Sequence, residues 1–146
     1  MGYIFSMAEY QREYARDLQA ASRQLIFHLL YMCFYPSNIA YSHWKSESYG
    51  LLPAELRPFK GKHRFPNRKF LFHNLYDHIH DSDGLPKNFK HEVQKKGLMV
   101  PYTFDMVYWD LIKKIGGIIS DVVDILVEDH AITDDEYYSV LGKYGL

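Results

Sequence analysis

Positively charged side chains crowd one stretch of this chain. Residues 57–74 hold six lysines and arginines and no aspartate or glutamate. Prolines and a glycine interrupt residues 50–66, which predicts an irregular connection. Uncompensated cations attract phosphates and carboxylates. We therefore predict that this stretch binds an anionic partner, either a nucleic acid or an acidic protein surface, although a plain solvated loop would have the same composition. The predicted anion-binding residues are Arg57, Lys60, Lys62, Arg64, Arg68 and Lys69.

Three residues of metal-ligand type follow at helical spacing. His73, Asp77 and His80 are separated by four and by three positions, so on a helix they share one face. Two histidines and one carboxylate are a ligand set for transition-metal ions. One alternative for this chain is therefore a metal-binding hydrolase that uses these three side chains. A solvent-facing helix end is the other interpretation of the same pattern.

Arginine is followed five positions later by histidine at two places, Arg23/His28 and Arg68/His73. This Arg-x4-His spacing resembles the active-site motif of HEPN-type helical ribonucleases. The resemblance implies metal-independent RNA cleavage, in which Arg68 would hold the scissile phosphate and His73 would act on the proton of the 2′-hydroxyl. Five residues on a helix turn the side chains about 140° apart, so the second subunit of a homodimer is expected to complete the site.

Four short motifs lie between about residues 20 and 110. They are His28-Leu-Leu-x5-Pro36, Trp44-Lys45, Leu56-Arg57-Pro58-Phe59 and Pro101-Tyr-Thr. Together they resemble a small helical bacterial family known only as a domain of unknown function. This resemblance implies a helical fold and carries no activity.

The apolar periodicity predicts the helices that position these residues. Long helices are expected over residues 8–35 and 104–129, and shorter ones over residues 39–49, 67–80 and 86–96. Thr133, followed three positions later by Glu136, is a capping-box signature, so a last short helix is expected after it. No strand-like alternation and no internal repeat is present. The predicted fold is all-α, a single-domain bundle of four or five helices over residues 1–146.

Two apolar stripes are expected to form the core, and a glycine pair interrupts the second. Gly116 and Gly117 cost up to about 1 kcal/mol each relative to alanine inside a helix, so we expect the close approach of another helix backbone, or a bend. The first stripe is Tyr14, Leu18, Ala21, Leu25, Leu29 and Met32, and the second is Phe104, Tyr108, Leu111, Ile115, Ile118, Val122 and Ile125.

Composition narrows the class of protein. Hydrophobic residues make up 47% of the chain and charged residues 24%, as in ordinary globular domains. One cysteine cannot form an intrachain disulfide, and the N-terminus lacks a signal-peptide pattern, so a cytoplasmic protein is expected. The charge-free run of residues 24–44 is broken by Pro36, which argues against a membrane span.

The charge is unevenly distributed around a net value of −1. Seven carboxylates and no lysine or arginine occur between residues 115 and 142, opposite in sign to residues 57–74. Such asymmetry suits an anionic partner or head-to-tail self-association. No cofactor motif is found, so no cofactor is expected. The favoured interpretation is a small helical interaction or regulatory protein that binds an anion through residues 57–69, and the ribonuclease and the metal hydrolase are its alternatives.

Overall fold

The computed structural model describes residues 7–52, 73, 76–77, 79–82, 84–129 and 131–146. These residues form five helices and no strand, which confirms the all-α prediction. The described residues between 73 and 80 are also helical, as expected, and the first part of that predicted helix lies outside the described residues. The helices are α1 (Met7–Phe34), α2 (Tyr41–Gly50), α4 (Gly84–Lys95), α5 (Phe104–Asp129) and α6 (Asp134–Lys143).

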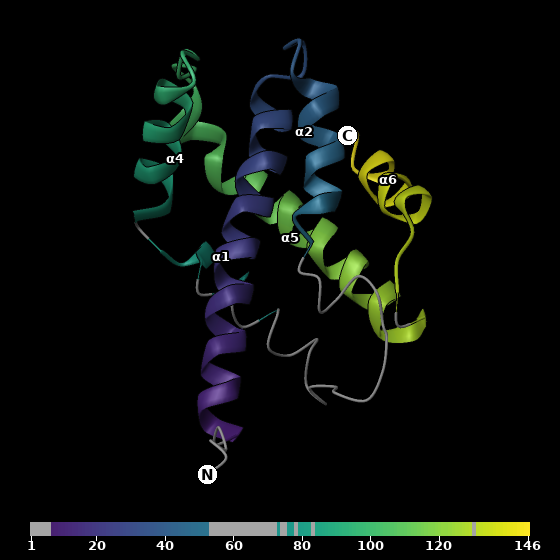
Figure 1. Cartoon of the computed structure of the whole chain (residues 1–146). Coiled ribbons are helices and arrows are strands. Elements are labelled where there is room, and N and C mark those ends of the chain that lie inside the picture. The colour runs from purple at the N-terminus through teal and green to yellow at the C-terminus, as the bar shows by residue number, and fades with distance from the viewer. Residues whose placement is uncertain (1–6, 53–72, 74–75, 78, 83, 130) are drawn as a thin grey trace.

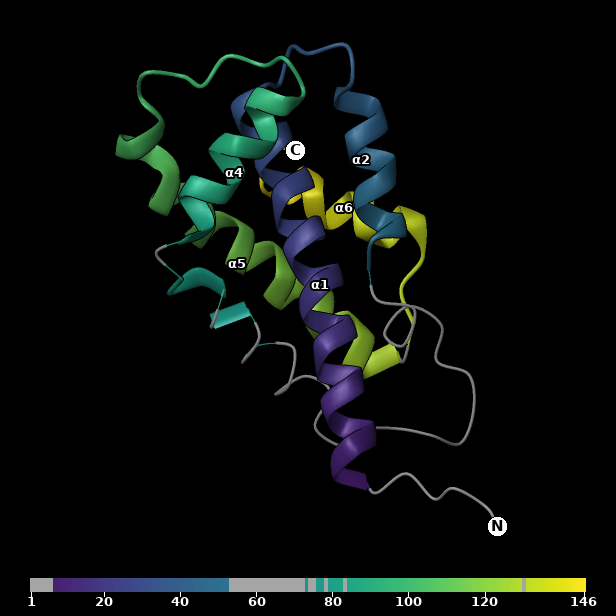
Figure 2. The same cartoon turned by 60° about the vertical axis from the view of Figure 1, so that its left-hand side comes forward.

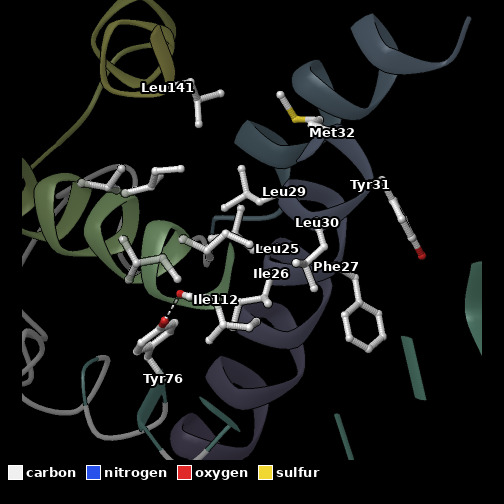
Figure 3. Packing of buried hydrophobic residues seen from close by; sticks show 14 of the residues in the cluster. Leu25, Ile26, Phe27, Leu29, Leu30, Tyr31, Met32, Tyr76, Ile112 and Leu141 are labelled. Carbon is white, nitrogen blue, oxygen red and sulfur yellow. Dashed lines mark hydrogen bonds between the residues drawn. The ribbon is translucent and has the colours of Figure 1, made fainter. Parts of the chain in front are cut away.

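Helix α1 is the central element of the fold. In Figures 1 and 2 it lies between α2 and α4 and crosses α5. From Leu25 to Met32, every side chain except half-buried His28 is buried. Leu25, Leu29 and Met32 of the expected stripe are therefore buried, but in this part of the helix the single stripe was too narrow, because a helix segment covered on nearly all sides is apolar nearly all round. The burial of Tyr14, Leu18 and Ala21 lies outside what the structure describes. Figure 3 shows Leu25 and Leu29 on one side of α1 and Phe27 and Tyr31 on the other.

Aromatic rings join α1, α4 and the start of α5. Phe89 of α4 is fully buried, and its ring centroid lies 5.3–5.8 Å from those of four other rings. Such distances are typical of favourable aromatic pairs. Phe89 therefore holds α4 against both long helices. Its four neighbours are Phe27, Tyr31 and Phe34 of α1 and Phe104 of α5.

The buried face of α5 is close to the predicted one but rotated slightly. Leu111 and Ile125 are only half-buried, whereas Ile112, Ile119 and Leu126 are buried. Ile112, Ile119 and Leu126 each directly follow a predicted core position. The predicted helical spacing of the buried residues is therefore right, but the buried face of α5 is centred on slightly different residues.

The glycine pair of α5 receives two tyrosine rings. A Cβ atom at Gly116 would lie 2.5 Å from Tyr76 Oη, and one at Gly117 would lie 2.8 Å from Tyr144 Oη. The Tyr76 hydroxyl donates a hydrogen bond to the Ile112 carbonyl, as Figure 3 shows. The predicted close approach exists, but the neighbour is a side chain and not the backbone of another helix.

Local signals set the end of α4 and the start of α6. Gly97 has a φ of 74°, and the Leu98 amide donates to the Val93 carbonyl, which closes the Schellman motif that ends α4. At the start of α6, Thr133 Oγ1 accepts a hydrogen bond from the Glu136 amide at 3.2 Å, and the Glu136 carboxylate accepts one from the Thr133 amide at 3.1 Å. The predicted capping box is confirmed.

None of the helices in the described ranges combines the length and the apolar character needed to cross a membrane.

Asp121 links α5 to the C-terminal end of the chain. Its Oδ2 accepts hydrogen bonds from Lys143 Nζ at 2.9 Å and from Tyr144 Oη at 3.0 Å. The lysine hydrogen bond is the main reason that the pKa of Asp121 lies below its usual value. A carboxyl whose pKa is lowered by folding stabilises the fold above its unfolded pKa, about 3.9, and this stabilisation is lost as the pH falls through the folded pKa.

We therefore expect Asp121→Asn to unfold at a lower urea concentration than the wild type at pH 7, and the gap to close as the pH falls below about 4. Urea midpoints measured at pH 7, 5 and 2.5 check this. Asp110→Asn is the matched control, because Asp110 is an exposed carboxylate of the same helix with no ion pair among the described residues. If the difference in urea midpoint between Asp121→Asn and the wild type is equally large at pH 2.5, the charge of Asp121 is not the cause of the stabilisation.

Candidate interaction surface

The predicted anion-binding segment lies outside the part of the chain that the structure describes. Its six cationic residues, at positions 57, 60, 62, 64, 68 and 69, lie outside the described residues. The ribonuclease pair is affected in the same way, because Arg68 is outside the described ranges and only half-buried His73 is inside them. Both the anion-binding segment and the Arg68/His73 pair stay predictions.

The predicted metal-ligand residues are described, and they are not gathered into a centre. Among the residues that the structure describes, no three histidine, cysteine or carboxylate side chains are arranged to hold a metal ion. Instead, His80 Nδ1 lies 3.3 Å from Asp81 Oδ1. The His80 ring packs against Tyr76 and Trp109, with centroid distances of 5.9 and 5.6 Å. His80 is thus a packing residue that seats its helical turn on α5.

The other Arg-x4-His pair lies on α1, and its histidine is already engaged. His28 Nδ1 lies 2.9 Å from the Gln24 carbonyl, and His28 Nε2 lies 3.0 Å from Glu47 Oε2 of α2. His43 Nε2 approaches the other oxygen of the same carboxylate at 3.2 Å. Because both ring nitrogens have partners and the His28 side chain is only 11% exposed, this histidine connects α1 to α2 and does not offer a free nitrogen to a substrate.

Basic side chains form a stripe along α4. Lys87, His91 and Lys95 recur at four-residue steps, and all three are exposed. None of them has an ion pair within the described part of the chain, whereas Lys90 on the flank of the helix pairs with Asp105 at 2.8 Å. We call Lys87, His91 and Lys95 the basic stripe. The sequence had indicated a short basic helix here, and the four-residue spacing was the signal that would have singled out these positions.

The opposite face of α4 anchors the basic stripe to the core. Leu85, Phe89 and Val93 are buried at the same four-residue spacing. One face of α4 therefore packs into the core and the opposite face lies in solvent, which fixes the direction in which Lys87 and Lys95 project.

Large apolar side chains are exposed where the chain enters α5. Met99, Tyr102, Met106 and Trp109 have exposed fractions of 85%, 97%, 77% and 39%. We call these four residues the α5 entry patch. The patch adjoins α4, because the Lys90–Asp105 ion pair joins the two helices beside Met106 and because Lys90 Nζ lies 4.8 Å from the centre of the Phe104 ring. Figures 1 and 2 both show the start of α5 next to α4.

Carboxylates gather at the far end of α5 and at the start of α6. The exposed acidic residues there are Asp124, Glu128, Asp129, Asp134 and Asp135. The last turn of α5 contains no basic residue. These carboxylates thus lie at the end of α5 that is far from α4 and its basic stripe. The basic half of the charge asymmetry predicted from the sequence, residues 57–74, lies almost entirely outside the described residues.

Comparison of the chain with protein-family models, with curated proteins and with solved structures finds no match. The HEPN-type resemblance and the resemblance to the domain of unknown function therefore stay predictions.

Proposed function

We propose that this protein is an interaction protein that binds an anionic partner through the basic stripe of α4. The observation that carries the proposal is the solvent-facing row of Lys87, His91 and Lys95, without ion pairs among the described residues. An ordinary solvated helix face mixes both signs of charge, whereas an unbalanced face raises the local concentration of anions.

The geometry of α4 supports this function. Lys87 and Lys95 are eight residues apart, which corresponds to about 12 Å along a helix. Two ammonium groups at that separation can contact successive charges on an extended polyanion or on an acidic helix. The buried face around Phe89 holds α4 in place, so little conformational entropy is lost when the partner binds.

The cationic segment at residues 57–69 is a second region predicted to bind anions. It supports the proposal from the sequence alone, since six of its residues are lysine or arginine. The proposal requires no catalytic group, and it leaves open whether the partner is a nucleic acid or a protein.

Neutralising the two lysines of the basic stripe tests the proposed function. We expect the Lys87→Gln/Lys95→Gln variant to bind both a fluorescent 20-nucleotide single-stranded RNA and a glutamate-rich peptide more weakly than the wild type. For RNA, the slope of log K against log salt should become shallower by about 1.4, because each lost phosphate contact contributes about 0.7. Fluorescence anisotropy at several salt concentrations measures both quantities.

A charge-matched control separates a local contact from a general effect of net charge. Ser42→Glu/Ser46→Glu also makes the protein more negative by two charges, at exposed positions four residues apart on α2. This control should keep most of the affinity. If the wild type binds neither probe, or if the control loses as much affinity as the α4 variant, the proposed function is wrong.

A further inference from the structure

The α5 entry patch is unusual because its apolar side chains are large and adjacent along the chain. Met106 and Trp109 are three positions apart in the first turns of α5, so they lie on the same side of the helix, and Tyr102 lies in the turn that leads into it. Met99 lies in the segment just before them. Contiguous exposed apolar surface on a folded protein marks an interaction site.

Several contacts hold the patch in place. The Tyr35 hydroxyl donates a hydrogen bond to the Met99 carbonyl at 2.9 Å, which fixes the segment between α4 and α5 to the end of α1. The Trp109 ring meets the buried Tyr108 ring edge to face, with centroids 5.1 Å apart. The His80 ring also packs against the Trp109 ring, with centroids 5.6 Å apart. The patch is thus already formed before a partner arrives, which reduces the entropic cost of binding.

Cations border the patch at both ends. Lys113 follows Trp109 by one helical turn and is exposed. On the α4 side lies Lys90, which neutralises Asp105, and the basic stripe occupies the solvent-exposed side of the same helix. Asp110 is the remaining exposed carboxylate in these turns of α5. A complementary surface would therefore have apolar side chains in its centre and carboxylates around them.

The shape of the patch favours a helical partner. Met106, Trp109 and Lys113 occur at positions i, i+3 and i+7, the spacing of one face of a helix, and helices commonly pack along such ridges. Two of the four apolar residues are methionines, whose flexible thioethers adapt to apolar side chains of a partner. Single-stranded nucleic acid would instead require a series of aromatic platforms for its bases.

We infer that the α5 entry patch binds an acidic amphipathic α-helix of a partner protein. Apolar side chains on one face of that helix pack against Met106 and Trp109, and its carboxylates meet Lys113 and the basic stripe. This inference rests on the proposed function, because it names the class of the anionic partner.

A designed peptide provides the probe. It is an 18-residue helix with leucines at i, i+3, i+4 and i+7 and with glutamate and alanine elsewhere, and a scrambled peptide of the same composition lacks the apolar face. The chain has two tryptophans, of which Trp44 is buried and Trp109 is 39% exposed. Covering the patch should therefore shift the tryptophan emission to shorter wavelength, and Trp109→Phe should remove that shift.

Met106→Glu should weaken binding of the amphipathic peptide about tenfold or more, as expected when a central apolar contact is replaced by a like charge. Val127→Glu is the matched control, because Val127 is another exposed apolar residue of α5, at 48% exposure, outside the patch. This control should keep the affinity. Because Met106 is 77% exposed, its variant should retain the thermal unfolding midpoint of the wild type, which shows that it is folded.

The remaining outcomes separate the inference from the function on which it rests. If the scrambled peptide binds as tightly, while Lys87→Gln/Lys95→Gln still weakens binding, the partner is recognised by charge alone and only the inference is wrong. The inference is also overturned if Met106→Glu weakens RNA binding as much as peptide binding. Sedimentation that shows a dimer of the wild type and a monomer of Met106→Glu would assign the patch to a second copy and would likewise overturn it.

Discussion

Replacing Phe89 with alanine is expected to lower the free energy of unfolding by about 3–5 kcal/mol, the range measured for large-to-small changes at buried aromatic positions. Phe89 has no exposed surface and is surrounded by four rings from α1 and α5. Its removal leaves a cavity where three helices meet. Since a domain of this size is stable by only about 5–15 kcal/mol, the variant should be close to unfolding at 37 °C.

Urea unfolding followed by circular dichroism measures this change. Tyr102→Ala is the control, because it also removes an aromatic ring but at a position that is 97% exposed. Its effect should stay within about 0.5 kcal/mol. A cost below about 1 kcal/mol for Phe89→Ala would show that α4 is not held by this ring cluster. In that case α4 would not hold the basic stripe in a fixed position.

Gly116→Ala is expected to destabilise the protein by about 1–3 kcal/mol, the usual cost of overpacking. Alanine is the better helix former by about 1 kcal/mol, so helix propensity alone predicts the opposite sign. The added methyl group would lie 2.5 Å from Tyr76 Oη. The Tyr76 ring is buried and its hydroxyl is bonded to the Ile112 carbonyl, so it cannot move without losing that bond.

Two comparisons test whether the Tyr76 ring is the cause. Gly142→Ala in α6 should stabilise the protein by up to about 1 kcal/mol, because nothing lies within 4 Å of a Cβ atom there. In a Tyr76→Ala background the neighbour is gone, and Gly116→Ala should then become neutral or stabilising. Urea midpoints of the four proteins of this cycle give the coupling. A destabilisation by Gly116→Ala that persists without the Tyr76 ring would contradict the explanation.

Gly117→Ala should cost less than Gly116→Ala. Its neighbour Tyr144 is only half-buried, near the C-terminus, and its hydroxyl is bonded to the Asp121 side chain. The ring can therefore swing outward into solvent, which the buried ring of Tyr76 cannot do.

The three predicted metal ligands show what helical spacing can and cannot predict. His73, Asp77 and His80 were correctly expected on a helix, but helical spacing cannot say whether a shared face meets other ligands or a tryptophan. For His80 it meets Trp109. The periodicity of α5 left Met106 and Trp109 out of the predicted core stripe, but only the packing shows how far they are exposed.

The sequence by itself determined the all-α class and several helix ends. Thr133 caps α6 and Gly97 ends α4 through hydrogen bonds within a few residues of the chain, so nearby side chains were sufficient to predict them. Only the tertiary structure decided that α1 is buried nearly all round from Leu25 to Met32, that Tyr76 fills the space at Gly116, and that α4 packs beside the start of α5. Those features depend on contacts between distant segments, which the periodicity of a single segment does not specify.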